Sequence, residues 1–510
     1  MANSFKTIIK NNCSETHLRR IIEYSILIFL FLQPFTRHTA TIRAVSLISA
    51  LAAWLLLLYL YPQSVWKKNP LNPYLLLYAL IAAGSVFISC APEESLRALK
   101  SNLFYQAALY LILVNTIESR RQIRRLLLVL TISFSILSLQ GIIESIPVGL
   151  KYYSYEYKKI YPRAIDGYAL LACFYWPLTL GALLWEAKLG VKNLLTLSLL
   201  AQTLIIYLYE TRIALIVCLL SAFFALLTTR RYKTLLVCLA VSAFSGIILG
   251  VSRPKEMGEK IARYASIFSR DSYITQNGSF AKADLQDEQA VKKLLQAGIL
   301  YQDRNIIDNV CFVNTIEDEK QLIQSLNLNG IALNASIITA WRSNYRNKPG
   351  LSGRRELWLG AWQVIRARFW LGYGYNPKIF SRAAGQSRFL EKWRRTLPTL
   401  YKDMTSNHPH SNPHNQFLSL LLEMGLIGLL IFLLFWGNFL LRLVKKLKQI
   451  KPDRDRVMLY AVIFTPVLAF FTVNLMNSLW NGAAGKLIIV IIVLGALFLN
   501  DGGFLPDDSS

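Results

Sequence analysis

The segment that decides the fold is "QFLSLLLEMGLIGLLIFLLFWGNFLL", residues Gln416–Leu441, in which Glu423 is the only charged residue. A helix needs about 20 largely apolar residues to cross ~30 Å of hydrocarbon, so this segment predicts a transmembrane helix. Eleven further apolar blocks bring the predicted total to twelve. The twelve expected spans are about 21–36, 42–61, 71–91, 102–117, 126–146, 165–185, 193–209, 212–229, 233–251, 416–441, 457–476 and 486–499.

The composition agrees with a chain that is membrane-embedded along most of its length. Of its 510 residues, 54% are hydrophobic and the mean hydropathy is +0.36. A soluble protein of this length is expected to form several domains with polar surfaces, whereas here the apolar residues recur in membrane-length blocks. We therefore predict an all-α polytopic membrane protein. No removable signal peptide is expected in residues 1–20, because no small-residue cleavage site follows a short apolar core.

The distribution of basic residues predicts the orientation. With the N-terminus in the cytoplasm, the short segments on that side hold 22 Lys and Arg, against 10 in the short segments on the other side. The expected regions are a membrane region of about nine helices (1–251), a large periplasmic loop between helices 9 and 10 (252–415), a membrane region of about three helices (416–499) and a cytoplasmic tail (500–510). The loop 252–415 is therefore expected to face outward, which is the periplasm in a Gram-negative cell.

The formal charge of +26 indicates contact with anionic membrane lipids or with an acidic substrate such as a diphosphate. No nucleic-acid-binding motif accompanies this charge, so nucleic acid is not an expected partner. The six cysteines include no CxxC pair, so a zinc or redox site built on cysteine is not expected either.

Three of the five histidines, His408, His410 and His414, directly precede the decisive segment. Asn415 is a suitable N-cap for a helix that begins near Gln416, which places His414 at the positive end of that helix. A neutral histidine is expected there, and it could act as a general base. A metal site formed by the three histidines and a purely structural cluster are the alternatives. Pro409 and Pro413 weigh against the metal site, because they prevent a regular helical spacing of the three ligands.

Two arginines are candidates for binding an acidic substrate. Arg212 lies at a corner between two apolar blocks, and Arg354 lies in the loop that approaches the same side of the membrane. An arginine at a membrane boundary is costly enough to suggest a function, and its guanidinium binds phosphate oxygens in pairs. The simpler interpretation of Arg212 is that it reaches to the lipid headgroups.

The second half of the large loop has two further features. Residues 280–335 form a mixed acidic and apolar stretch, which we interpret as an insertion or small subdomain. In "GLSGRRELWLGAWQVIRARFW", Trp358, Trp362, Ile365 and Phe369 recur at helical spacing and predict an amphipathic helix, either packed on the bundle or lying at the lipid interface. The following "GYGYN", residues 372–376, predicts a tight turn that brings its backbone close to another segment.

Taken together, these segments resemble the O-antigen ligase family and its wider superfamily of O-antigen polymerases and bacterial protein O-oligosaccharyltransferases. The family motif is His, then Asn, Ser or Gln, nine residues, Gly, two residues, then Gly, Thr or Tyr; here it is matched by His414-Asn415, Gly425 and Gly428. The segments "SGRRELW", "FWLGYG" and "LYETRIAL" resemble other family motifs, and "SCAPEESLRALK" resembles the family's third extracytoplasmic loop. Phe369 stands where the family usually has proline.

This resemblance implies a metal-independent enzyme without a cofactor, which transfers a glycan from undecaprenyl diphosphate to a sugar hydroxyl of lipid A-core. It also implies a location in a bacterial inner membrane, with the active site facing the periplasm. His414 would be the general base, and Arg212 and Arg354 would hold the diphosphate. Residues expected to support substrate binding are Arg355, Asn415, His410, Gly372 and Gly374. The alternatives are an O-antigen polymerase, a protein O-oligosaccharyltransferase and, from another class, a non-enzymatic transporter of lipid-linked glycan. A transporter is disfavoured because repeated halves with polar residues at the bilayer midplane are not evident in the sequence.

Overall fold

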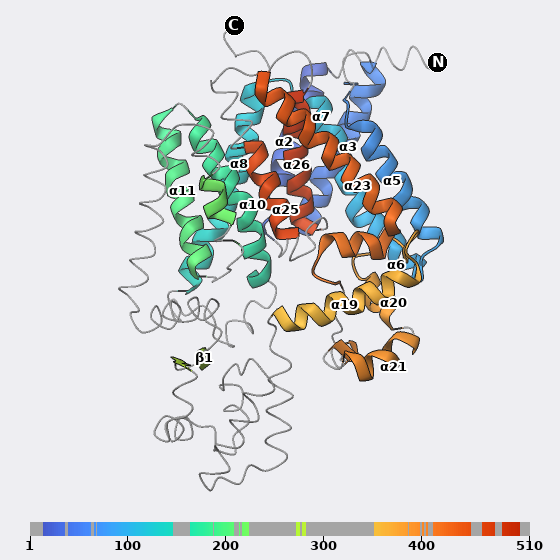
Figure 1. Ribbon diagram of the computed structural model, residues 1–510. Helices are drawn as coiled ribbons and strands as arrows, with labels where there is room; N and C mark the ends of the chain where they lie inside the picture. The colour runs from blue at the N-terminus through green and yellow to red at the C-terminus, as the bar shows by residue number, and fades with distance from the viewer. Residues whose placement is uncertain are drawn as a thin grey trace, which may run out of the picture. The chain divides into compact units, whose positions relative to one another are not determined.

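The computed structural model describes the chain in several stretches, and only these are considered below (Figure 1). They are residues 14–35, 39–62, 66–67, 69–145, 164–186, 188–208, 214, 217–223, 272–275, 278–281, 351–385, 387–397, 400–401, 404–405, 412–449, 462–474 and 482–499. Within them the protein is helical, with one exception. That exception is an antiparallel hairpin of β1 (Ser272–Thr275) and β2 (Gly278–Ala281), in which Tyr273 pairs with Phe280. The predicted all-α fold class is thus confirmed for the described helices. The hairpin is a short addition that was not predicted, and its aromatic and β-branched residues favour strands.

The chain divides into two compact units. One comprises Met1–Ser245, Trp358–Lys392 and Met404–Ser510, and the other comprises Gly246–Leu357 and Trp393–Asp403. The helices of the first unit include α2 (Glu15–Phe31), α3 (Ala40–Leu60), α5 (Asn72–Phe87), α6 (Pro92–Ala98), the π-helix η1 (Leu99–Phe104), α7 (Tyr105–Thr116), α8 (Arg120–Ser145), α10 (Ala164–Trp185), α11 (Leu189–Leu208), α20 (Ile379–Ala384), α23 (Gln416–Gln449), α25 (Thr465–Asn474) and α26 (Gly482–Leu499). Two more, α19 (Leu351–Ala367) and α21 (Ser387–Thr396), have residues in both units.

Four of the described helices are long and apolar enough to cross a membrane: Ala40–Leu60, Arg120–Ile143, Leu189–Ile206 and Gln416–Gln449. Four shorter apolar helices accompany them, at Asn72–Phe87, Leu171–Trp185, Val462–Asn474 and Ala484–Leu499. Multiple apolar helices therefore support a multi-pass membrane protein. The predicted span 233–251 and most of 212–229 lie outside the described residues, so the total of twelve spans and the extent of the large loop stay predictions.

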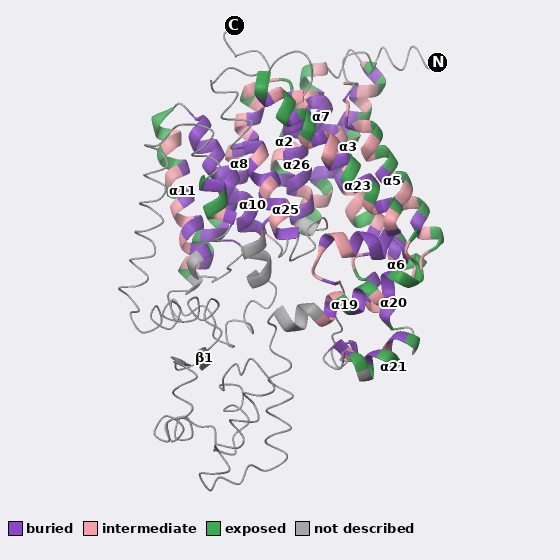
Figure 2. Ribbon diagram, viewed as in Figure 1, coloured by how far each residue is buried: buried purple, intermediate pink, exposed green. Residues whose placement is uncertain are grey.

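Buried residues are concentrated on the central helices, such as α8, α10 and α26 (Figure 2). Aromatic side chains and a few polar contacts lie in this interior. Trp436 on α23 stacks on Phe470 of α25 at 5.1 Å between ring centroids. Between α10 and α11, the Gln202 amide donates to the Thr179 hydroxyl at 3.0 Å. Such a hydrogen bond between apolar helices satisfies polar groups that lipid could not satisfy.

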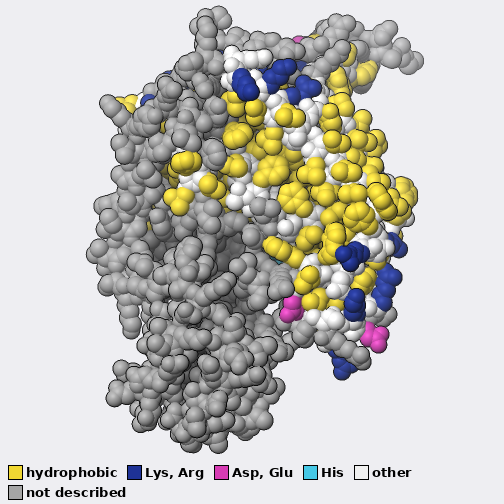
Figure 3. All heavy atoms as spheres, in the orientation of Figure 1, with side chains coloured by type: hydrophobic (Ala, Val, Ile, Leu, Met, Phe, Trp, Pro, Cys, Tyr) yellow, Lys and Arg dark blue, Asp and Glu magenta, His cyan; other side chains and the backbone are white. Residues whose placement is uncertain are grey.

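The outer surface agrees with a membrane environment. Figure 3 shows a broad hydrophobic area on the viewed face over α23 and its neighbours, with Lys and Arg side chains gathered at its ends. On α23, Leu430, Leu434 and Leu441 are 48%, 58% and 73% exposed, and the basic residues Arg442, Lys445 and Lys448 follow near the end of this helix. An exposed apolar surface that ends in basic residues is typical of a membrane-spanning helix.

Candidate functional site

The candidate site is built around the first residues of α23. The Asn415 side chain accepts hydrogen bonds from the backbone N–H groups of Phe417 at 3.0 Å and Leu418 at 3.1 Å, which confirms the predicted N-cap and the helix start at Gln416. His414, directly before the cap, has a positive φ of 49°, and its backbone N–H donates to Oδ1 of Asn412 at 2.9 Å. The side chains of Asn412 and Asn415 therefore fix the backbone on both sides of the half-exposed histidine.

A contact from α19 supports the same loop. The indole N–H of Trp358 donates to the carbonyl of Pro413 at 3.0 Å. The buried residues of α19 include Leu357, Ala361, Val364 and Ile365, whereas Trp362 is 37% exposed. The predicted apolar face is therefore only partly the packing face: Ile365 is buried as expected, while Trp362 lies outside the core and forms an edge contact with Phe369 at 6.3 Å between ring centroids.

Helix α23 is interrupted at Gly425, where φ is 65° and ψ is −164°. In a regular helix the carbonyl of Leu422 would accept from the N–H of Leu426. Here the Leu426 N–H donates instead to the carbonyl of Phe369 at 2.8 Å, and the carbonyl of Leu422 accepts from the N–H of Tyr373 at 2.7 Å. The helix and the turn after α19 thus exchange backbone partners, so the interruption leaves these groups satisfied. The sequence pattern had predicted an uninterrupted helix here.

Three glycines make this exchange sterically possible. Gly372, Gly374 and Gly425 all have positive φ, at 71°, 111° and 65°. A Cβ on Gly372 would lie 2.6 Å from the backbone nitrogen of Gly425, and a Cβ on Gly425 would overlap the Trp370 carbonyl. The predicted tight turn at residues 372–376 is confirmed, and it packs closely against α23.

The other side of the turn contacts the end of α5 and the residues that follow it. The N–H of Tyr375 donates to Oγ of Ser85 at 2.9 Å, and the N–H of Cys90 donates to the carbonyl of Tyr373 at 3.0 Å. A Cβ on Gly374 would collide with Ser89, so the backbones approach each other directly. The turn therefore lies between two segments that are far apart in the sequence.

An ion pair continues this contact. Glu94 on α6 accepts from the Asn376 amide at 3.2 Å and pairs with the guanidinium of Arg382 on α20. The hydrogen bond from Arg382 lowers the pKa of Glu94 below its ordinary value. Burial has the opposite effect on the neighbouring phenols, because it raises the pKa of Tyr373 and of Tyr375.

Not all of the predicted site residues belong to this described geometry. His414, Asn415, Gly372 and Gly374 do. Arg212 and His410 lie outside the described residues, as does His408, on which the three-histidine metal alternative depends. Arg354 and Arg355 lie near the start of α19, but their side chains are not among those described.

Several contributing residues were not selected as site residues from the sequence. Trp358, Asn412, Ser85, Glu94 and Arg382 all hold the loop or the turn, as described above. The segment "SCAPEESLRALK" was singled out for its resemblance to a family loop, and it contains Glu94. No sequence signal connected that loop to Asn376 or Arg382, which lie nearly 300 positions later.

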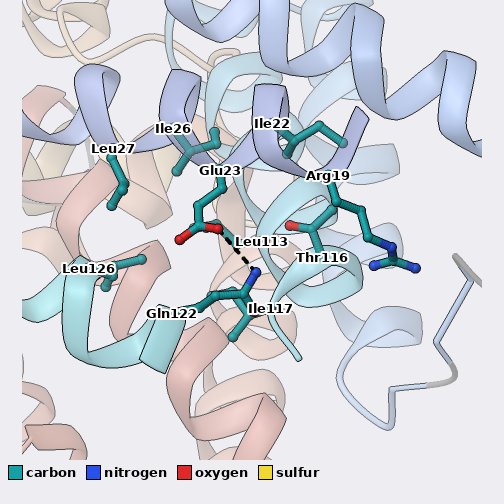
Figure 4. Close-up of a pocket in the computed structure, with 10 residues that line it drawn as sticks. All are labelled: Arg19, Ile22, Glu23, Ile26, Leu27, Leu113, Thr116, Ile117, Gln122 and Leu126. Carbon is teal, nitrogen blue, oxygen red and sulfur yellow. Dashed lines mark hydrogen bonds between the residues drawn. The ribbon is translucent and has the colours of Figure 1, made fainter. Parts of the chain in front are cut away.

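A small pocket elsewhere in the first unit does not extend the site. It lies among α2, α7 and α8, and it is lined by Arg19, Ile22, Glu23, Ile26, Leu27, Leu113, Thr116, Ile117, Gln122 and Leu126 (Figure 4). The Gln122 amide donates to Glu23 at 3.4 Å, and Arg125 pairs with the same carboxylate at 2.7 Å. Its volume of about 20 Å³ suits a water molecule rather than a sugar or a lipid. These contacts connect the middle of α2 to the start of α8.

The fold and the site define a multi-pass membrane protein in which a histidine loop is fixed at the start of a long apolar helix. Residues 197–433 match the family model described as O-antigen ligase, a range that runs from α11 through α19 and the turn into α23. The chain thus carries the domain of the O-antigen ligase family, and the resemblance seen in its motifs is confirmed. This family places the chain among membrane enzymes of the glycan ligase and polymerase type. No curated protein matches the chain.

Proposed function

We propose that the chain is an O-antigen ligase, which transfers a glycan from undecaprenyl diphosphate to a sugar hydroxyl of lipid A-core on the periplasmic side of the inner membrane. The observation that carries the proposal is the placement of His414. Its backbone is held between Asn412 and the Asn415 cap, at the start of a helix inside the matched family domain. A base in a fixed position is what a hydroxyl nucleophile requires.

In the proposed reaction, His414 removes the proton from the acceptor hydroxyl as its oxygen attacks the anomeric carbon. The bond between this carbon and the diphosphate oxygen breaks, the configuration at the carbon inverts, and undecaprenyl diphosphate leaves. On the family resemblance, we propose that Arg212 and Arg354 bind the diphosphate and stabilise the charge that develops on it. Because the diphosphate is already a good leaving group, the reaction needs no nucleotide, and we propose that it needs no metal.

The remaining predicted residues have supporting roles in this proposal. Gly372 allows the turn to pack against α23, Gly374 allows it to approach Ser89, and Asn415 fixes the helix start. Arg355 and His410 would contact the donor or acceptor. The polymerase and the protein O-oligosaccharyltransferase use the same carrier and the same kind of base, so the test has to distinguish acceptors.

The test is the lipopolysaccharide gel profile of a strain whose only copy carries His414→Ala, with the undecaprenyl-linked glycan pool measured in parallel. Bare core with long polymer left on the carrier would support the ligase. Core carrying a single repeat would indicate a polymerase instead. An unchanged ladder would refute both. His17→Ala is the matched control, because His17 is exposed on α2 and lies outside the matched domain.

Two further measurements test the assigned roles. Arg212→Ala and Arg354→Ala should each reduce transfer severely, since each removes a charged contact to the leaving group. Incubation with a chelator should leave transfer intact. Loss of activity on chelation, restored by zinc, would instead support the three-histidine metal site.

A further inference from the structure

Two basic side chains lie near the starts of two helices of the first unit. Arg43 is in the first turn of α3, and Lys486 lies near the start of α26. The Lys486 ammonium is 5.5 Å from the ring centroid of Tyr105 on α7 and 6.0 Å from that of Phe29 on α2. Phe29 lies near the end of α2, and Arg43 lies at the start of α3, which packs against α2. Arg43 is therefore at the same end of this helix pair as the Phe29 ring beside Lys486, and its positive charge acts on the ammonium.

No carboxylate accompanies this pair among the residues that the structure describes. The described ion pairs join Arg19 to Glu15 and Glu118, Lys67 to Glu118, Arg124 to Glu186, Arg125 to Glu23 and Arg382 to Glu94. Arg43 and Lys486 are both half-buried, and Nε of Arg43 is shielded from solvent without an acceptor in hydrogen-bond range. The site therefore holds two positive charges and a donor directed at no described acceptor.

The local electrostatics make this arrangement unfavourable unless an anion is present. The N-terminus of a helix carries a partial positive charge, and both cations lie near such an N-terminus. Two like charges in a medium of low dielectric repel each other, and each also loses hydration. The aromatic rings of Phe29 and Tyr105 compensate only in part, because a cation–π contact contributes about 0.5–2 kcal/mol.

We propose that Arg43 and Lys486 bind the phosphate of a lipid headgroup. A guanidinium binds phosphate oxygens in pairs, and an ammonium adds a compact point charge. The lipid origin of the phosphate follows from the surface beside the site. Ile42, Val45 and Ile48 on α3 are 52%, 57% and 62% exposed, so apolar surface that acyl or prenyl chains can cover begins next to Arg43. The proposal is independent of the reaction assigned to His414.

A binding measurement tests the proposal and distinguishes two sources of the phosphate, a bilayer phospholipid and a polyprenyl carrier. Delipidated full-length protein in a neutral detergent is titrated with phosphatidylglycerol and, separately, with undecaprenyl phosphate, and bound lipid is counted by native mass spectrometry. The double variant Arg43→Gln/Lys486→Gln should bind at least one probe about tenfold more weakly than the wild type, as loss of charged hydrogen bonds implies.

The matched control is Arg366→Gln/Lys378→Gln, which removes the same charge from two exposed residues. It should bind both probes as the wild type does. Selective loss of phosphatidylglycerol in the double variant would identify a structural phospholipid, and selective loss of undecaprenyl phosphate would identify the carrier. Equal binding by the double variant and the wild type, or equal loss in the control, would overturn the proposal.

Thermal unfolding provides a second test, in which removal of one of the two charges should not destabilise the lipid-free protein. In lipid-free detergent, Lys486→Met should unfold at the same temperature as the wild type or a higher one, because it removes a repulsive charge. Addition of the bound probe should raise the unfolding temperature of the wild type but not that of the variant. A lower unfolding temperature for Lys486→Met without lipid would show that the protein itself satisfies this charge, and it would overturn the proposal.

Discussion

The indole N–H of Trp358 donates at 3.0 Å to the carbonyl of Pro413, the residue directly before His414. One hydrogen bond thus connects α19 to the loop that carries the proposed base. Because the two residues are 55 positions apart, this contact depends on the arrangement of the whole turn between them.

Trp358→Phe keeps an aromatic ring and removes this donor. We expect a loss of about 1–2 kcal/mol in the free energy of unfolding, because a partly buried carbonyl loses its partner. Transfer should fall as well, since the His414 loop becomes less fixed. Thermal unfolding and a transfer assay on the purified protein measure the two effects. Trp370→Phe, at a residue that is 64% exposed, is the control and should change neither.

Gly374→Ala tests the close approach between the turn and Ser89. The φ of 111° is unfavourable for alanine, and the added Cβ would overlap Ser89. We expect destabilisation of about 2–4 kcal/mol and loss of transfer. In Gly437→Ala the new methyl group meets nothing within 4 Å, so this variant should fold at least as well as the wild type. Equal behaviour of the two variants would contradict the packing described for the turn.

Asn415→Ala removes the cap of α23. We expect a loss of about 1 kcal/mol in stability, because two backbone N–H groups at the helix start lose their acceptor. Asn415→Ser should recover most of the stability, since serine can also accept a bond at this position. If transfer falls in the alanine variant and returns in the serine variant, the cap positions His414. A fall in both variants by the same factor would point to a direct role of the amide instead.

The ion pair of Glu94 predicts a dependence of stability on pH. Arg382 lowers the pKa of Glu94 below its ordinary value of about 4.5. The stability that Glu94 contributes is therefore present above pH ~4.5, and it is lost as the pH falls through the lower pKa of the folded state. Glu94→Gln should unfold at a lower temperature than the wild type near pH 7, and the difference should shrink on acidification. Glu93→Gln changes the exposed neighbouring residue, so this variant should unfold at the same temperature as the wild type at every pH.

Local features of this site could be predicted from the sequence. Asn415 before a long apolar block identified the cap and the helix start, because capping depends on adjacent residues. The two glycines of "GYGYN" identified a tight turn, because positive φ favours glycine. The partners of that turn could not be predicted, since Ser85 and Ser89 lie nearly 300 residues earlier and a single sequence does not show which segments meet.

Predictions based on side-chain hydrophobicity were less accurate. On α19 the tryptophans suggested the buried face, but small Ala361 is buried and Trp362 is partly exposed, because close packing between helices favours small side chains. The interruption of α23 at Gly425 was also missed. A glycine within an apolar block is compatible with a continuous helix, and only the competing donor and acceptor of the turn cause the break.

The exchange of backbone partners at Gly425 also has a consequence for how the protein is assembled. The chain is synthesised from its N-terminus, so the segments around Ser85 and Phe369 exist before Leu422 and Leu426 have been made. Until α23 arrives, the N–H of Tyr373 and the carbonyl of Phe369 lack their final partners. The packing of the turn against α23 is therefore a late event in biogenesis, and a nascent chain that stops before α23 cannot complete it.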